Sequence, residues 1–150
     1  MNYLWDTGIL LHRIRQSPLF YQLDAQYLFT ASGNFPAISF VTVGEIYSLK
    51  FQLNWGEKKS RTLEEVLRQI KPLPIERKDI LLGYAMIDTY SQGKLSGKPL
   101  PQGMTSRNMG KNDIWIAATT FATNSSLVTL DSDFDHLHNV FIEVIKPGPA

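Results

Sequence analysis

The 150-residue sequence contains no cysteine, which excludes disulfide bonds, thiolate metal ligands and a cysteine nucleophile. It also contains no apolar run approaching the ~20 residues that a membrane-spanning helix needs. The first residues place an acid, Asp6, where a secretory signal has a long apolar stretch. We therefore expect a cytoplasmic protein that is not inserted in a membrane.

A strong excess of charge of one sign is also absent. Lysine and arginine total 15 and the acidic residues total 14, so the formal net charge is only +1 at pH 7. A polyanionic partner must therefore be attracted by local basic patches rather than by the molecule as a whole. The length suffices for one compact domain with a real core and is too short to argue for two domains, so we expect residues 1–150 to form a single domain.

Short apolar runs alternate with helical patterns along the chain. The segments typical of strands or extended chain are residues 3–5, 36–41, 71–75, 126–130 and 140–145. The segments with helical spacing are residues 9–15, 19–31, 42–53, 60–70, 76–92 and 113–123. This order predicts an α/β fold with a mostly parallel central sheet and helices on both of its faces.

Four acidic residues lie where an apolar run meets the expected start of a helix, namely Asp6, Glu45, Asp113 and Asp131. The carboxyl ends of parallel strands share one edge of a sheet, so these side chains are expected to converge there. Closely spaced carboxylates repel one another, and hard divalent cations with oxygen ligands relieve that repulsion. The pattern therefore indicates metal-assisted phosphoryl chemistry with Mg²⁺ or Mn²⁺.

Each of these acids also has a purely structural explanation. Asp6 can cap the helix that follows it, and the spacing of Thr42 and Glu45 fits a capping box. Asp113 can help to cap its own helix, and Asp131 suits a polar turn. Capping explains each acid separately but not why all four fall at expected strand ends, so the joint pattern favours a functional site.

Four segments together resemble the PIN-domain ribonucleases, and in particular the VapC-type toxins of bacterial toxin–antitoxin pairs. These segments are Tyr3–Thr7, Thr42–Ile46, Asn112–Ala118 and Leu127–Phe134, and they follow this order along essentially the whole chain. The resemblance implies a PIN-like fold, a Mg²⁺ or Mn²⁺ site, cleavage of RNA, a homodimer, and neutralisation by a cognate antitoxin protein.

The same resemblance assigns roles to individual acids. It makes Asp6, Glu45 and Asp113 the three principal acids and Asp131 the fourth, with Asp133 as the second choice for that last position. The reaction would then be hydrolysis of RNA phosphodiesters by metal-activated water, with the carboxylates as ligands of one or two ions rather than as nucleophiles.

Two further residues are secondary candidates for the site. The Thr129 hydroxyl can hold a carboxylate or a metal-bound water, although threonine is also an ordinary strand residue. Asn112 lies beside Asp113 and can replace contacts of an asparagine that the family commonly has after Asp-Thr. This chain has Gly8 at that position.

Residues 93–110 contain four glycines, two prolines and no acid, which predicts a long loop. The basic residues in and just after it are Lys94, Lys98, Arg107 and Lys111. An acidic pocket repels RNA, so we expect these residues to supply an RNA-binding track beside Asp113. Each of them taken singly is better explained as a solvated loop residue, but as a group beside Asp113 they favour a phosphate-binding track.

Other features have two readings. Trp115 suits base stacking, but more commonly such a residue packs against a neighbouring helix. Apolar residues at 19–20 and 27–29 suit the core, a dimer face or an antitoxin site. We assign the three histidines to structural or surface roles because an all-oxygen site fits the acids better.

The competing function is a catalytically inactive PIN-like binding module, and the presence of all four acids argues against it.

Overall fold

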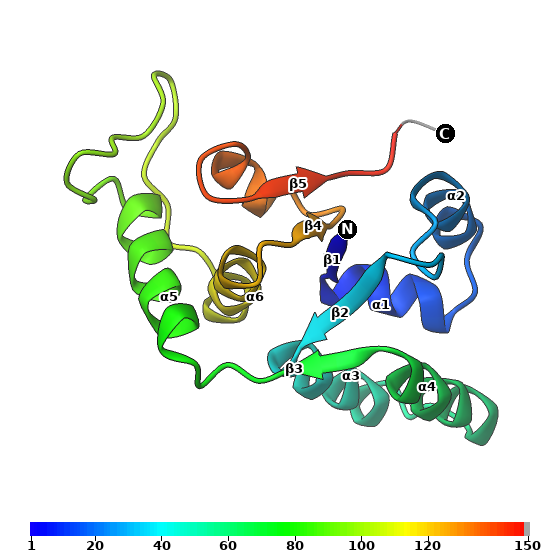
Figure 1. Cartoon of the computed structure of the whole chain (residues 1–150). Coiled ribbons are helices and arrows are strands. Elements are labelled where there is room, and N and C mark those ends of the chain that lie inside the picture. Colours follow the sequence, from blue (N-terminus) through cyan, green and yellow to red (C-terminus); the bar gives the residue numbers. More distant parts are fainter. Residues whose placement is uncertain (149–150) are drawn as a thin grey trace.

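The computed structural model describes residues 1–148 and contains a five-stranded sheet with the strand order β3-β2-β1-β4-β5 (Figure 1). The strands are β1 (Asn2–Trp5), β2 (Phe35–Ser39), β3 (Lys71–Leu73), β4 (Ser126–Val128) and β5 (Glu143–Ile145). The helices are α1 (Thr7–Ile14), α2 (Pro18–Tyr27), α3 (Phe40–Gln52), α4 (Glu57–Gln69), α5 (Lys78–Ser91) and α6 (Lys111–Ala122), with a 3₁₀ helix, η1 (Ser132–Leu137). Each pair of neighbouring strands is parallel, which confirms the predicted α/β class.

The strands bury side chains on both faces of the sheet. Tyr3 and Trp5 of β1 belong to one hydrophobic core, whereas Leu4 between them belongs to a second core on the opposite face. Figure 1 shows α1 and α2 beside one face and α5 and α6 beside the other. The prediction of helices on both faces is therefore confirmed.

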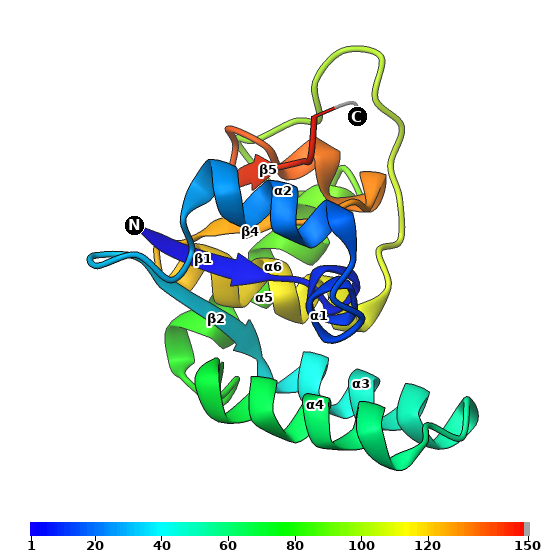
Figure 2. The ribbon, with the colours of Figure 1, turned by 90° about the vertical axis from the view of Figure 1, so that its right-hand side faces the viewer.

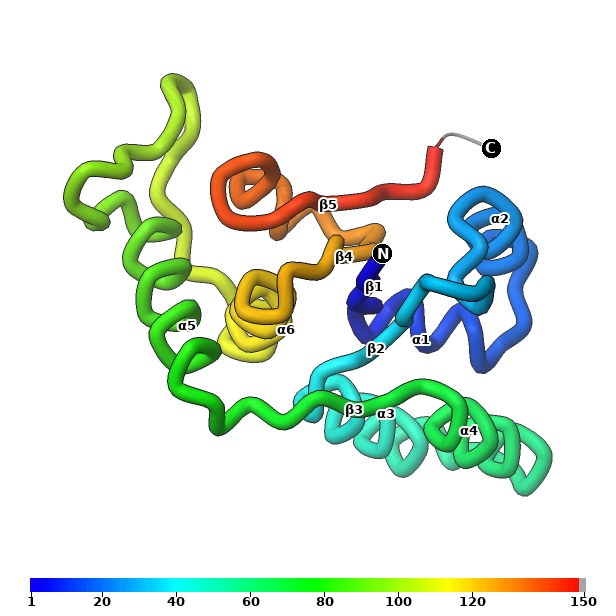
Figure 3. Tube along the Cα trace, in the orientation of Figure 1, coloured from blue at the N-terminus to red at the C-terminus, as the bar shows by residue number. Residues whose placement is uncertain are grey.

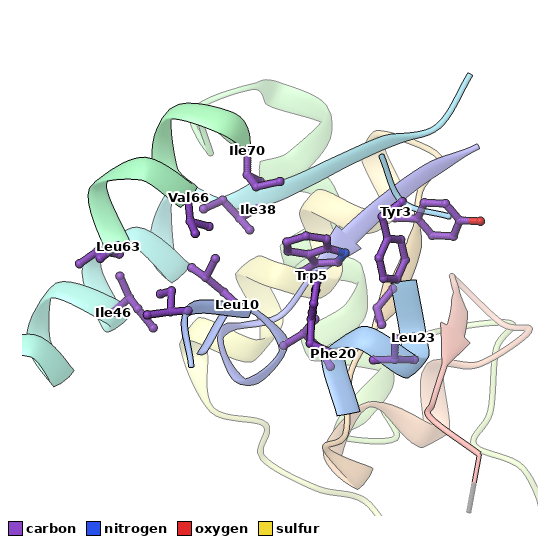
Figure 4. Packing of buried hydrophobic residues seen from close by; sticks show 14 of the residues in the cluster. Tyr3, Trp5, Leu10, Phe20, Leu23, Ile38, Ile46, Leu63, Val66 and Ile70 are labelled. Carbon is purple, nitrogen blue, oxygen red and sulfur yellow. The ribbon is translucent and has the colours of Figure 1, made fainter. Parts of the chain in front are cut away.

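The first core is rich in aromatic rings. Trp5 is 1% exposed, and its ring makes edge contacts with Phe20 and Phe29 at centroid distances of 5.2 and 5.3 Å. Figure 4 shows the cluster continuing from Trp5 towards Leu63 and Val66 of α4. Such edge-to-face pairs are favourable beyond the area that they bury. This core fixes α1, α2 and α4 against the sheet.

The apolar residues around α2 belong mainly to this core. Phe20 and Phe29 are buried, and Leu19 and Tyr27 pack against the same cluster. Leu28 remains 56% exposed. The structure therefore favours a core role for residues 19–20 and 27–29 over a dimer face or an antitoxin site.

Several element boundaries differ from the sequence prediction by a few residues, among them the end of α2 and the start of the last strand. Helix α2 ends at Tyr27 rather than near residue 31, because Leu28 adopts the left-handed conformation with φ 51° and closes the helix. The last strand begins at Glu143 rather than Val140. The Val140 amide instead donates to the Leu137 carbonyl and so completes the turn after η1.

Residues 93–110 form the predicted loop, which extends beyond α5 and returns to the start of α6 (Figure 3). The helices within residues 1–148 are all too short or too polar to cross a membrane.

Candidate functional site

The chain order of the sheet reverses at β1, because β2 and β3 lie on one side of it and β4 and β5 on the other. In parallel sheets, ligands bind beyond the carboxyl ends of the strands at such a switch point. A cleft of about 330 Å³ lies there, and its lining residues are Asp6, Thr7, Gly8, Glu45, Asp113, Ile116, Leu130 and Asp131. The fold thus brings four acids to one cleft although they span residues 6 to 131.

Asp6 combines a capping role with a place in the cleft. It follows β1 and caps α1, because its Oδ1 accepts a hydrogen bond from the Ile9 amide at 2.9 Å. Its Oδ2 accepts a hydrogen bond from the Thr129 hydroxyl. Burial raises the pKa of Asp6, and these two hydrogen bonds oppose that effect by stabilising the charged form. The carboxylate is therefore held by one donor from α1 and one from the segment that follows β4.

The capping-box interpretation of Glu45 is wrong. Helix α3 begins at Phe40, and its N-cap is Ser39, whose hydroxyl accepts from the Val41 amide. Glu45 therefore lies one turn inside the helix, where its Oε1 accepts a hydrogen bond from the Thr7 hydroxyl at 2.7 Å. Sequence reasoning missed Thr7, although its position directly after Asp6 was a usable signal.

Asp113 lies in the first turn of α6 rather than at its cap, because the helix begins at Lys111 with Gly110 as the N-cap. Its side chain is half-buried. Burial, and then the nearby carboxylates, with Asp131 first among them, raise the pKa of Asp113 to about 6. Such a shift is expected for a buried carboxyl group that is surrounded by other carboxylates, because both effects disfavour its charged form.

Both candidates for the fourth acid lie near Asp113. Asp131 caps η1 by accepting a hydrogen bond from the Asp133 amide at 2.9 Å, so this segment is a 3₁₀ helix rather than a simple turn. Oxygens of Asp113, Asp131 and Asp133 all lie within 4.8 Å of one another. Among residues 1–148 this is the only such group of three or more metal-ligand side chains. An all-carboxylate donor set fits a hard divalent cation.

The secondary candidates occupy different places. Thr129 is fully buried, and besides donating to Asp6 its hydroxyl accepts from the Asp131 amide at 2.9 Å. The Thr129 hydroxyl therefore links the carboxylate of Asp6 to the backbone of Asp131. Asn112 is exposed and lies beside Glu45 in an adjoining cavity. A Cβ atom at Gly8 would lie 3.4 Å from Asp6 Oδ1, so glycine leaves that side of the carboxylate open.

The basic residues of the loop are divided among three places. Lys94 and Arg107 line one small cavity of about 260 Å³. Lys111 is the first residue of α6 and is two positions from Asp113, whereas Lys98 Nζ lies 4.6 Å from the Phe141 ring centroid. Figure 2 shows the loop descending to α6 on the side of the molecule to which β1 points.

The remaining candidates make structural contacts. Trp115 packs against Tyr84 of α5, with 4.2 Å between the ring centroids. His136 is buried and its Nε2 lies 2.7 Å from the Ser91 hydroxyl. Burial, followed by the charge of Arg107, lowers the pKa of His136 to about 4. The other two histidines bond Ser17 and the Val144 amide, which agrees with the structural roles predicted for all three.

Comparison with known proteins identifies one similar protein sequence and two similar solved structures. Ribonuclease VapC2 from Rickettsia felis is 27% identical over 144 residues, which cover 95% of this chain and 97% of that protein. The structure of VapBC-1 from nontypeable Haemophilus influenzae has a TM-score of 0.70 at 20% identity and covers 97% of this chain and 98% of its own. A toxin–antitoxin complex from Klebsiella pneumoniae has a TM-score of 0.67 at 19% identity, covering 99% of both chains.

The PIN domain family model matches residues 3–140, a range that contains all the acids of the cleft. The match therefore spans most of the chain and includes strands β1 to β4 apart from Asn2, whereas β5 lies beyond its end. This chain belongs to the PIN domain family.

Proposed function

We propose that this protein is a metal-dependent endoribonuclease that acts as the toxin of a bacterial toxin–antitoxin pair. The observation that carries the proposal is the cleft of four carboxylates at the switch point of a PIN domain. The relative named as a ribonuclease and the neighbouring toxin–antitoxin complex support it. A catalytically inactive binding module would have no need to keep several carboxylates close together at a cost in electrostatic repulsion.

We assign Mg²⁺ or Mn²⁺ to Asp6, Glu45, Asp113 and Asp131, with Asp133 as the second choice for the fourth position. When bound, the ion would polarise the phosphate, lower the pKa of the attacking water and stabilise the leaving oxygen. Asp6 is only 7% exposed and both of its oxygens accept hydrogen bonds, so it suits a positioned ligand better than a nucleophile.

The direct test is cleavage of total RNA by purified protein that is free of antitoxin. We expect cleavage with Mg²⁺ or Mn²⁺ and none with EDTA. No cleavage by wild-type protein under either condition would favour the inactive binding module. Because we propose RNA as the substrate and an antitoxin as the inhibitor, we also propose that the protein acts in the cytoplasm. From the family resemblance we propose a homodimer.

Thr7 is expected to act as a positioning residue for Glu45. Thr7→Val removes the hydroxyl that donates to Glu45 Oε1 at 2.7 Å but keeps a branched side chain of similar size. Loss of such a supporting hydrogen bond typically lowers metal affinity ~10-fold to 100-fold. We expect a rise of this size in the dissociation constant for Mn²⁺, measured by calorimetry.

Thr7→Ser keeps the hydroxyl and is the matched control for this prediction. It should bind Mn²⁺ nearly as well as wild-type protein does. Equal affinity in Thr7→Val would show that the contact does not position Glu45 for the metal.

We further propose that Lys94, Arg107 and Lys111 contact RNA phosphates, with Lys98 partly engaged by Phe141. Lys111→Gln removes the positive charge nearest to Asp113 in the sequence. Each phosphate contact to single-stranded RNA contributes about 0.7 to the slope of log affinity against log salt. We therefore expect a shallower slope by about this amount, measured with RNA in Ca²⁺ to prevent cleavage.

The control for this charge change is Lys71→Gln. Lys71 is exposed at the start of β3, away from the carboxyl edge of the sheet. Its removal should leave the salt dependence unchanged. If Lys111→Gln leaves the slope of log affinity against log salt unchanged, Lys111 does not contact an RNA phosphate.

A further inference from the structure

A second cavity, of about 580 Å³, adjoins the acidic cleft and shares Thr7 and Glu45 with it. We call this cavity the α3 groove. Its other lining residues are Val41, Gly44, Ser48, Leu49, Gln52 and Asn112. Those on α3 recur every three or four positions and so form one stripe of the helix. Figure 2 shows α3 running away from the end of β2, so the groove leads outward from the acids.

The lining of the α3 groove suits an uncharged group better than a phosphate. Glu45, at the end shared with the cleft, is the only charged side chain among the described residues that line it. An anion would be repelled there and would meet no basic partner. Val41 and Leu49 supply half-buried apolar surface. A Cβ atom added at Gly44 would meet no atom within 4 Å, so the groove is open beside this residue.

The polar groups of the groove match the edge of a nucleobase. Gln52 Nε2 donates to the Ser48 hydroxyl at 2.7 Å, which orients the carboxamide along α3. Its Oε1 and second N–H remain for a ligand. Asn112, from the first turn of α6, brings a second carboxamide to the same groove. Carboxamides offer a donor and an acceptor together, and proteins use them to recognise base edges.

We propose that the α3 groove binds an RNA base next to the scissile phosphate, and that Gln52 and Asn112 determine which base is accepted. The proposal rests on the nuclease function proposed above. It separates two tasks between two surfaces. The basic loop would hold phosphates, which carry no sequence information, whereas the groove would read a base edge.

The test uses purified wild-type protein, Gln52→Ala and Asn112→Ala on a pool of random-sequence RNA with Mn²⁺. Sequencing of the product ends reports the base preference at each position that flanks the cut. We expect wild-type protein to prefer particular bases there and each variant to reduce that preference about tenfold, the typical effect of losing contacts to one base edge. Gln22→Ala, an exposed glutamine of α2, is the matched control and should keep the wild-type preference.

A second variant separates recognition from folding. Gln52→Glu keeps the size of the side chain but replaces its donor with an acceptor. It should shift the preference towards the bases that offer an amino group, which are adenine, cytosine and guanine, and away from uracil. A purely structural role of Gln52 would not produce such a shift. Both Gln52 variants should also keep the wild-type thermal stabilisation by Mn²⁺, because Gln52 lies beyond Glu45 in the groove.

Several results would overturn the proposal. The proposal fails if wild-type protein cleaves RNA without any base preference. It also fails if Gln52→Ala and Asn112→Ala cleave with the wild-type preference. Unchanged cleavage combined with weaker inhibition by antitoxin would assign the groove to the antitoxin instead. If wild-type protein does not cleave RNA at all, the nuclease proposal itself fails, and this outcome is distinct from the others.

Discussion

Asp6→Asn is expected to lower RNA cleavage about a hundredfold or more while the protein remains folded. Asparagine is also a good N-cap residue, so its Oδ1 can still accept from the Ile9 amide. The variant loses the negative charge that we assign to the metal. A metal ion contributes several kcal/mol to such reactions, and about 1.4 kcal/mol corresponds to a tenfold change in rate. Initial rates of RNA cleavage in Mg²⁺ or Mn²⁺ measure the effect.

The matched control for this result is Asp88→Asn on α5, which makes the same chemical change outside the cleft. It should cleave at the wild-type rate. Circular dichroism should show wild-type helix content in both variants. Full activity of Asp6→Asn would contradict the assignment of Asp6 to the metal site.

Asp113→Asn should abolish cleavage and at the same time stabilise the metal-free protein. Burial, followed by the nearby carboxylates, raises the pKa of Asp113 to about 6 in the folded chain, from 3.8 for an aspartate in water. The folded state therefore prefers the protonated form, and wild-type stability in EDTA should fall as the pH rises through this interval. The variant cannot ionise there. Because Asp113 is half-exposed, solvent screening reduces the expected gain at neutral pH to about 1 kcal/mol.

Urea denaturation in EDTA at several pH values between 4 and 8 would measure this difference. Added Mg²⁺ or Mn²⁺ should reverse the order of stability, because binding to the folded state stabilises wild-type protein more than the variant. The interpretation fails if Asp113→Asn is less stable than wild-type protein at neutral pH in EDTA, or if both show the same dependence on pH.

Local sequence patterns are enough to predict the order of strands and helices along the chain and the edge of the sheet where the acids meet. The alternation of Tyr3, Leu4 and Trp5 between two buried faces follows from the two-residue repeat of a strand. The placement of Asp6 and Asp131 at one edge follows from parallel strands that both end there. These features depend on local apolar patterns and on general rules of topology, so the sequence was sufficient to predict them.

How the acids are held, and which residues adjoin them, depends on contacts between segments that are far apart in the chain. The Thr7 hydroxyl meets Glu45 across 38 positions of the chain, and the Thr129 hydroxyl meets Asp6 across 123. The end of α2 at Leu28 depends on a left-handed residue that local propensity disfavours. Contacts of this kind arise when packed helices bring distant side chains within hydrogen-bond distance. No local pattern of residues specifies them, because each one depends on the position of every element between its two partners.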